Sequence, residues 1–263
     1  MKVFIVLLAN GAVMLAQTPP PTKSAAPAAK SAAPAAKPAA PAVNPLLHPE
    51  NLKAKAPDSF KVKLTTTKGD IVVQVHRDWS PLGADRFYNL VKNRYFTNAA
   101  FFRIVPNFIV QFGMAPDPKV GAACQTATIK DDPAKPGVHN TKGTLVFATA
   151  GPGTRSNQFF VNTRDNTGSL DSQGFTPFGE VTEGMDIVLA LNSSYGERPD
   201  QGHILNEGKA YLDQNFPNLD SIKSAVVMPA EGAAAAAPAA KSTAPAAKST
   251  APAAKSTTPP VKK

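Results

Sequence analysis

Seven-residue units that each contain proline occupy both ends of this chain of 263 residues. The unit reads KSAAPAA from residue 23 and KSTAPAA from residue 241, and each is repeated directly afterwards. Seven is the period of coiled coils, but a proline in every unit removes a backbone donor and clashes inside a helix. The units also carry too little apolar surface to offset the entropy of ordering. We therefore expect disordered, extended tails over 17–45 and 229–263, and one folded domain over 46–228.

The basic charge of the chain belongs to these tails. The formal net charge is +9, from 28 Lys and Arg against 19 Asp and Glu. Nine of the lysines and the acid Glu231 lie in residues 1–45 and 229–263, which leaves 19 basic and 18 acidic residues in the centre. Because the centre is almost neutral, we expect no binding of nucleic acid by the folded part.

Two functions are open for the tails. Evenly spaced lysines on an extended chain would contact an anionic polymer or lipid of the cell envelope. The alternative, which the composition favours, is a soluble spacer that holds the domain away from surfaces. A binding assay across a salt series separates the two, because electrostatic binding weakens as the salt concentration rises.

The first 16 residues have the features of an export signal. Lys2 is followed by an apolar run from Val3 to Leu15, which is too short to span a bilayer as a stable anchor. Ala16 before the polar Gln17 indicates a cleavage point after residue 16. We expect an exported protein, periplasmic or secreted from a bacterium. An uncleaved N-terminal anchor is the alternative.

Sequence patterns for metal, phosphate and hydrolytic chemistry are weak. The Gly-rich stretch 151–156 lacks the lysine and the spacing of a phosphate loop, and no G-x-S-x-G elbow is present. The adjacent pair Asp131 and Asp132 is poor support for a cation site, and the single cysteine, Cys124, cannot form an intrachain disulfide. The histidines lack the i, i+4 spacing of a helical metal site. We expect neither a metal nor a cofactor. The histidines are His48, His76, His139 and His203.

Short runs with apolar residues at alternate positions predict a mainly β domain. The clearest is a hairpin, 60–66 with 71–76, around Gly69. Ser80 followed by Pro81 predicts the start of a helix. Further strands are expected at 101–105, 109–112, 144–148, 158–161, 178–181 and 222–227, with helices at 81–93 and 185–191 and a short one at 210–212. Such a pattern indicates a closed or nearly closed antiparallel barrel capped by helices, with its last strand beside its first.

Arg103 lies within an unusually apolar run, FFRIVPNFIVQFG, at residues 101–113. In a strand over 101–105, Arg103 would share a face with Phe101 and Val105, although its charge resists desolvation. On the next strand, Ile109, Gln111 and Gly113 would share a face. The pattern alone leaves two interpretations open: a functional cation, or an arginine paired with a carboxylate elsewhere.

Three blocks of the centre resemble the cyclophilins, the cyclosporin-binding family of peptidyl-prolyl cis-trans isomerases. The first is the run around Arg103, and the others are GTLVFATAGP to SNQFFV at 143–161 and LD to FGEV and EGM at 170–185. They occur in the order and spacing of the family. The resemblance implies a closed antiparallel eight-stranded β-barrel capped by two α-helices. It also implies an isomerase of X-Pro bonds that needs no cofactor, acts on proline-containing polypeptides in the folding of exported proteins, and is a monomer.

The resemblance also implies a role for each matched position. Arg103 would be the catalytic residue, and Gln111 would bind the substrate backbone. Gln158 would help to hold Arg103. The proline pocket would be lined by Phe108, Ile109, Phe160 and Leu170, with Phe175 at its edge, and the peptide would pair with Ala148, Thr149 and Ala150.

Two departures from the family pattern bear on ligands. Ser169 stands where many members carry tryptophan, and the only tryptophan of this chain is Trp79. Because that tryptophan is linked to drug binding in the family, we expect weak cyclosporin affinity. Phe175 stands near a position that is usually histidine. A non-catalytic adaptor, which binds proline peptides and is tethered to the envelope by its tails, is the alternative to an enzyme, and the retained Arg103 favours the enzyme.

Overall fold

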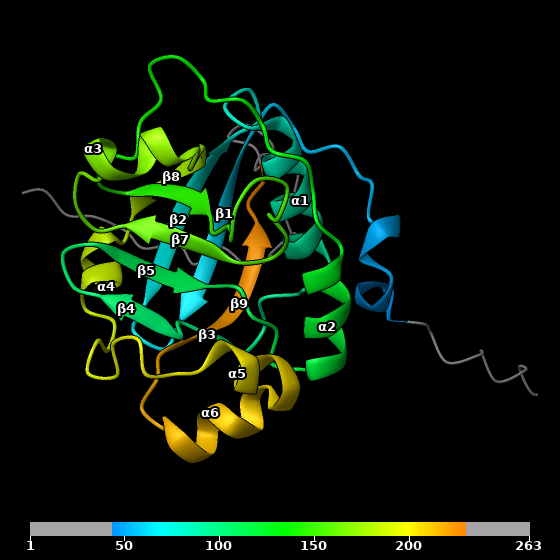
Figure 1. Cartoon of the computed structure of the whole chain (residues 1–263), viewed down its shortest axis with the longest axis vertical. Helices are drawn as coiled ribbons and strands as arrows, with labels where there is room; N and C mark the ends of the chain where they lie inside the picture. The colour runs from blue at the N-terminus through cyan, green and yellow to red at the C-terminus, as the bar shows by residue number, and fades with distance from the viewer. Residues whose placement is uncertain (1–43, 230–263) are drawn as a thin grey trace, which may run out of the picture. The chain divides into compact units, whose positions relative to one another are not determined.

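The computed structural model describes residues 44–229, and these contain one antiparallel sheet with the strand order β3-β9-β1-β2-β8-β6-β7-β5-β4 (Figure 1). The predicted signal at 1–16, most of the linker and all but the first residue of the tail lie outside the described residues. The strands are β1 (Ser59–Thr66), β2 (Asp70–His76), β3 (Ala99–Ala100), β4 (Arg103–Val105), β5 (Ile109–Phe112), β6 (Thr144–Phe147), β7 (Phe159–Asn162), β8 (Pro177–Glu183) and β9 (Ser221–Val227).

The mainly β, antiparallel class predicted from the sequence is confirmed. β1 and β2 form the expected hairpin, and β9 pairs with β1. The described sheet differs from the expected closed eight-stranded barrel: it has nine strands, and its order is open, ending at β3 and β4, which are consecutive in the chain. Only Phe101 and Phe102 separate them. The two side chains enter different apolar clusters, Phe101 the main core and Phe102 a cluster with Met114, Ile204 and Leu212. This corner carries the chain from one edge of the sheet to the other.

The helices predicted at 81–93 and 185–191 are present, but the described residues contain more helices than the sequence indicated. Helices α1 and α4 match the predictions at 81–93 and 185–191, and α6 contains the short predicted helix. Between 192 and the last strand, the sequence predicted only the short helix at 210–212, yet α5 and α6 pack beside each other there (Figure 1). The α-helices are α1 (Pro81–Lys92), α2 (Pro118–Thr126), α3 (Thr167–Leu170), α4 (Met185–Leu189), α5 (Gln201–Glu207) and α6 (Lys209–Asn215). None of the helices within 44–229 is long and apolar enough to cross a membrane.

A cluster of phenylalanine rings fills the core behind the sheet. Phe147 and Phe159 lie 4.5 Å apart between ring centroids, and Phe178 lies 5.1 Å from Phe147. Phe87 of α1 contacts Phe159 and Phe178 at 5.3 Å each. All of these side chains are fully buried, so their burial and ring contacts favour one packing of helix α1 on the strands.

The strands β5, β6 and β7 are buried on both faces. Phe112, Phe147 and Phe159 point into the phenylalanine core, whereas Val146 and Phe160 belong to a separate apolar cluster. Because side chains alternate across a strand, that cluster lies on the opposite face of the sheet.

Buried charges tie the start of α1 to two loops. Ser80 occupies the cap position, as predicted, but its side chain does not cap the helix. The carboxylate of Asp132 accepts instead from the backbone N–H groups of Leu82 at 3.0 Å and Gly83 at 2.9 Å. Asp132 also pairs with the buried Arg155 at 3.1 Å, and Arg155 lies 3.2 Å from Asp131. Asp131 and Asp132 therefore bind the buried Arg155, and Asp132 also binds the first N–H groups of α1.

Replacing Asp132 by Ala is expected to lower the free energy of unfolding by about 3 kcal/mol, because it removes one of the two carboxylates that pair with the buried Arg155 and leaves two helix N–H groups without a partner. Ser80→Ala, which removes one neutral hydroxyl from the same network, is the matched control and is expected to cost about 1 kcal/mol. Urea unfolding at neutral pH measures both. Equal losses for the two variants would contradict a dominant role for the carboxylate.

Candidate active site

Four neighbouring strands place a cation, an amide, an aromatic ring and an aliphatic side chain in one row. Arg103 on β4 is paired in register with Gln111 on β5, Gln111 with Phe160 on β7, and Phe160 with Val146 on β6. Adjacent strands lie about 4.8 Å apart, so the row changes from charged to apolar across three strand spacings. The face that carries this row is the one opposite the phenylalanine core.

This face is hollowed into a cavity of about 390 Å³. Every site residue predicted from the sequence lines it, although the three sequence blocks come from separate elements. Four more lining residues, Gln125, Thr154, Ser156 and Gln201, were not predicted; they come from α2, the 149–156 loop and the first position of α5. The predicted lining residues are Arg103, Phe108, Ile109, Gln111, Ala148, Thr149, Ala150, Gln158, Phe160, Leu170 and Phe175.

One end of the cavity is an apolar pocket. Ile109, Phe160 and Leu170 are buried there with Val146 beneath them. Phe175 closes the edge, with its ring 5.6 Å from that of Phe160 in an edge-to-face arrangement. A pocket of this kind accepts a small apolar ring and excludes water around it.

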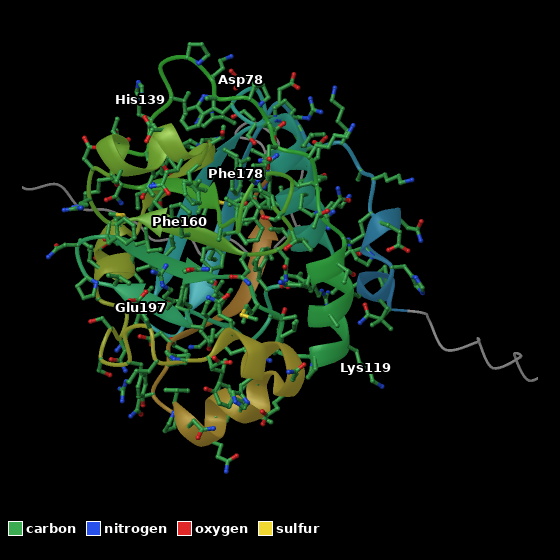
Figure 2. The ribbon with its side chains drawn as sticks, in the orientation of Figure 1. Asp78, Lys119, His139, Phe160, Phe178 and Glu197 are labelled. Carbon is green, nitrogen blue, oxygen red and sulfur yellow. The ribbon has the colours of Figure 1, made fainter. Side chains whose placement is uncertain are left out.

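Arg103 lies at the polar end of the cavity and its guanidinium is held on two sides. Nε donates to Oε1 of Glu197 at 2.7 Å, and Nη2 lies 2.5 Å from the same oxygen. Nη1 donates to Oε1 of Gln111 at 3.1 Å. Nε2 of Gln111 in turn donates to Oε1 of Gln158 at 2.9 Å, so Gln158 acts on Arg103 only through Gln111. In Figure 2, Phe160 lies on the β7 ribbon and Glu197 on the loop between α4 and α5 that passes β4.

The prediction that Arg103 shares a strand face with Phe101 and Val105 is partly wrong. Val105 is half-buried next to it, but Phe101 points into the main core, because β4 begins only after the corner at Phe101 and Phe102. The alternative that a distant carboxylate pairs with Arg103 is confirmed by Glu197. That carboxylate does not remove Arg103 from the cavity, whose lining still includes it.

A family model described as "Cyclophilin type peptidyl-prolyl cis-trans isomerase/CLD" matches residues 61–208. The chain belongs to the cyclophilin family. It is therefore a peptidyl-prolyl cis-trans isomerase, and proline-containing peptides are its substrates.

Curated relatives of this cyclophilin carry the same activity in their names. A peptidyl-prolyl cis-trans isomerase of Acinetobacter baylyi is 33% identical over 153 residues, which cover 55% of this chain and 80% of the relative. Peptidyl-prolyl cis-trans isomerase B of Escherichia coli is 29% identical over 174 residues, which cover 64% and 98%. A crystal structure of a cyclophilin-type isomerase from Cryptosporidium parvum has a TM-score of 0.49 at 18% identity, covering 65% of this chain and 98% of that one.

The cavity lining around Thr149 offers main-chain groups. The hydroxyl of Thr149 folds back onto the carbonyl of Gly151 at 2.5 Å and lies 2.7 Å from the hydroxyl of Thr154. Within residues 44–229, the backbone N–H and C=O of Thr149 have no hydrogen-bond partner. The side chain thus stabilises the turn and leaves the backbone for pairing with an extended peptide.

The described part of this cyclophilin contains no group of three or more His, Cys, Asp or Glu that could hold a metal ion. Ser169, at the position of the family tryptophan, is exposed and donates to the carbonyl of Asn166 at 3.1 Å. Weak cyclosporin affinity stays a prediction.

Asp171 supports the turn that carries Leu170 and Phe175. It accepts from Nδ2 of Asn140 at 2.7 Å, and its other oxygen lies 2.7 Å from Nδ1 of His139. Asn140 also donates to the carbonyl of Phe175 at 2.7 Å. Partial burial would raise the pKa of the Asp171 carboxyl, but the hydrogen bonds from Asn140 and His139 outweigh burial, and the pKa lies below its ordinary value.

Because the pKa of Asp171 is depressed in the folded chain, its ionised form stabilises the fold above the unfolded pKa, and this contribution is lost as pH falls through the folded pKa. Asp171→Asn keeps the shape but cannot ionise, so at pH 7 it is expected to lower the free energy of unfolding by about 1.5 kcal/mol. Urea unfolding of both proteins across acidic pH should show their stabilities converging. A difference that is constant with pH would show that the charge of Asp171 is not involved.

Proposed function

We propose that this cyclophilin accelerates rotation about X-Pro bonds by stabilising the twisted amide with the guanidinium of Arg103, and that its substrates are exported polypeptides. The observation that supports a role for Arg103 is that only some of its N–H groups have hydrogen-bond partners among the described residues. A guanidinium has five N–H bonds, of which Glu197 engages two and Gln111 one. One N–H on each terminal nitrogen remains for a substrate at the border between the polar and apolar ends of the cavity.

The reaction needs a donor at the proline nitrogen. Resonance gives the X-Pro bond partial double-bond character, with a rotational barrier of about 18–20 kcal/mol. In the twisted state resonance is lost, the nitrogen becomes pyramidal, and its lone pair can accept a hydrogen bond. A guanidinium N–H aimed at that nitrogen binds the twisted form better than the planar one, and this difference lowers the barrier. No proton is removed and no covalent intermediate forms.

The apolar pocket supplies the other half of the mechanism. Ile109, Phe160 and Leu170 would hold the pyrrolidine ring, while the backbone of Thr149 and the amide of Gln111 would hold the peptide on either side of it. Exclusion of water by the ring strengthens the hydrogen bond from Arg103. Arginine suits this position better than lysine, because its planar fork can be fixed by two partners while other N–H bonds stay available.

Arg103→Ala is expected to lower kcat/KM for a proline peptide by about 10²–10³-fold, the usual cost of removing a donor to a transition state. Arg103→Lys should recover only part of the rate. A protease-coupled isomerase assay gives the values, and Arg94→Ala, which changes an exposed arginine outside the cavity, is the matched control. A wild-type rate in Arg103→Ala would overturn the proposed mechanism.

Support for exported substrates comes from residues 1–16. A charged start, a short apolar run and small residues before Gln17 are the pattern of a cleaved export signal. We expect the protein isolated from the cell envelope or medium to begin at Gln17, as measured by intact mass and N-terminal sequencing. Deletion of residues 2–16 should keep the protein in the cytoplasm. A full-length chain in the membrane fraction would instead support an uncleaved anchor.

A further inference from the structure

We infer that Glu197 is a positioning residue for Arg103, and that the conformation of the loop 192–200 places the carboxylate of Glu197 against the guanidinium. The inference rests on the proposed function of Arg103. Glu197 lies 94 residues after Arg103 in the chain, and its Oε1 receives both Nε and Nη2 of the guanidinium. With Gln111 on Nη1, the fork is fixed at two edges.

The main chain sets the position of Glu197. The backbone N–H of Ile104, the middle residue of β4, points away from β5 and donates to the carbonyl of Gly196 at 3.1 Å. Gly196 has a φ of +58° and closes a turn onto the carbonyl of Ser193 at 3.0 Å. The loop therefore pairs with the outer edge of β4 at the residue next to Arg103, and Glu197 is the residue next to Gly196. The two side chains are brought together by this one backbone hydrogen bond.

The loop is anchored at several points to the segment 216–220. The backbone N–H of Asn192 donates to the buried carboxylate of Asp220 at 2.8 Å, and Nδ2 of Asn192 donates to the carbonyl of Asn218 at 2.9 Å. The ring of Tyr195 packs edge-to-face on Phe216 at 5.2 Å. These contacts do not involve Glu197, so the loop is expected to keep its shape when that side chain is changed.

Glu197 therefore restricts a flexible side chain and does little else. Its own side chain is 61% exposed and that of Arg103 is 28% exposed, so without the carboxylate the guanidinium has room to turn toward solvent. Displacements of about 1 Å at a reacting centre can lower rates by about 100-fold. If the carboxylate instead acted mainly by masking the charge of the catalytic cation, its removal would raise the rate, so the two roles predict opposite changes.

Glu197→Ala is expected to lower kcat by about 10- to 100-fold with KM almost unchanged, because the apolar pocket that binds the ring is intact. Glu197→Gln, whose amide oxygen can accept from the same two N–H groups, should recover most of the rate. Asp213→Ala is the matched control: Asp213 is equally exposed at 61% and pairs with Lys209 on α6, outside the cavity. Its rate should equal that of the wild type.

A double-mutant cycle with Arg103→Ala tests whether Glu197 acts through Arg103. In the full-length chain, Glu197→Ala should have no further effect once Arg103 is alanine, and thermal unfolding should show that all variants are folded. Two results would overturn the inference while the mechanism of Arg103 stands: a rate in Glu197→Ala that equals or exceeds wild type, or additive losses in the double variant. If Arg103→Ala itself keeps the wild-type rate, the proposed mechanism fails first, and the inference with it.

Discussion

The burial of β5, β6 and β7 on both faces is the constraint on which the active site depends. One face packs Phe112, Phe147 and Phe159 against the helices, and the other carries the row from Arg103 to Val146. Because side chains alternate, a slip of one residue in any of these ladders would exchange the two faces. The core side chains thus fix the register of the cavity residues, and the geometry at Arg103 is as well determined as the packing behind it.

Two arginines in this chain show what distinguishes a structural cation from a functional one. Arg155 is almost fully buried, and its partners are Asp131, Asp132, Ser80 and the carbonyl of Lys130. Arg103 keeps two N–H bonds without partners among the described residues, and its acid is exposed. An exposed pair contributes about 0.2–1 kcal/mol to stability, so the fold gains little from Glu197. The arrangement at Arg103 is better explained by orientation than by stability.

Most of the correct predictions of strands, helices and site residues came from local sequence patterns. The hairpin around Gly69, helix α1 and the full set of eleven matched positions could be predicted, because each depends on contiguous residues or a family pattern. The helices α2 and α5 could not, since each buries few apolar residues: α2 buries Val120 and Cys124 besides Gly121, and α5 buries only Ile204. No sequence pattern indicated the contact of Glu197 with Arg103 either. It is an exposed acid in a polar loop, and only the fold brings it to Arg103.

The open edge of the sheet and the pairing of Glu197 with Arg103 have a common origin. A strand paired along the outer side of β4 would have taken the N–H of Ile104 and filled the space beside Arg103. Because the sheet order ends at β4, this N–H needs another partner, and the carbonyl of Gly196 supplies it. A loop is free to place a charged residue directly after that carbonyl, whereas the next position of a paired strand would point to the opposite face or into a neighbour. The edge of the sheet is thus the place where a carboxylate can reach the cation without entering the apolar pocket.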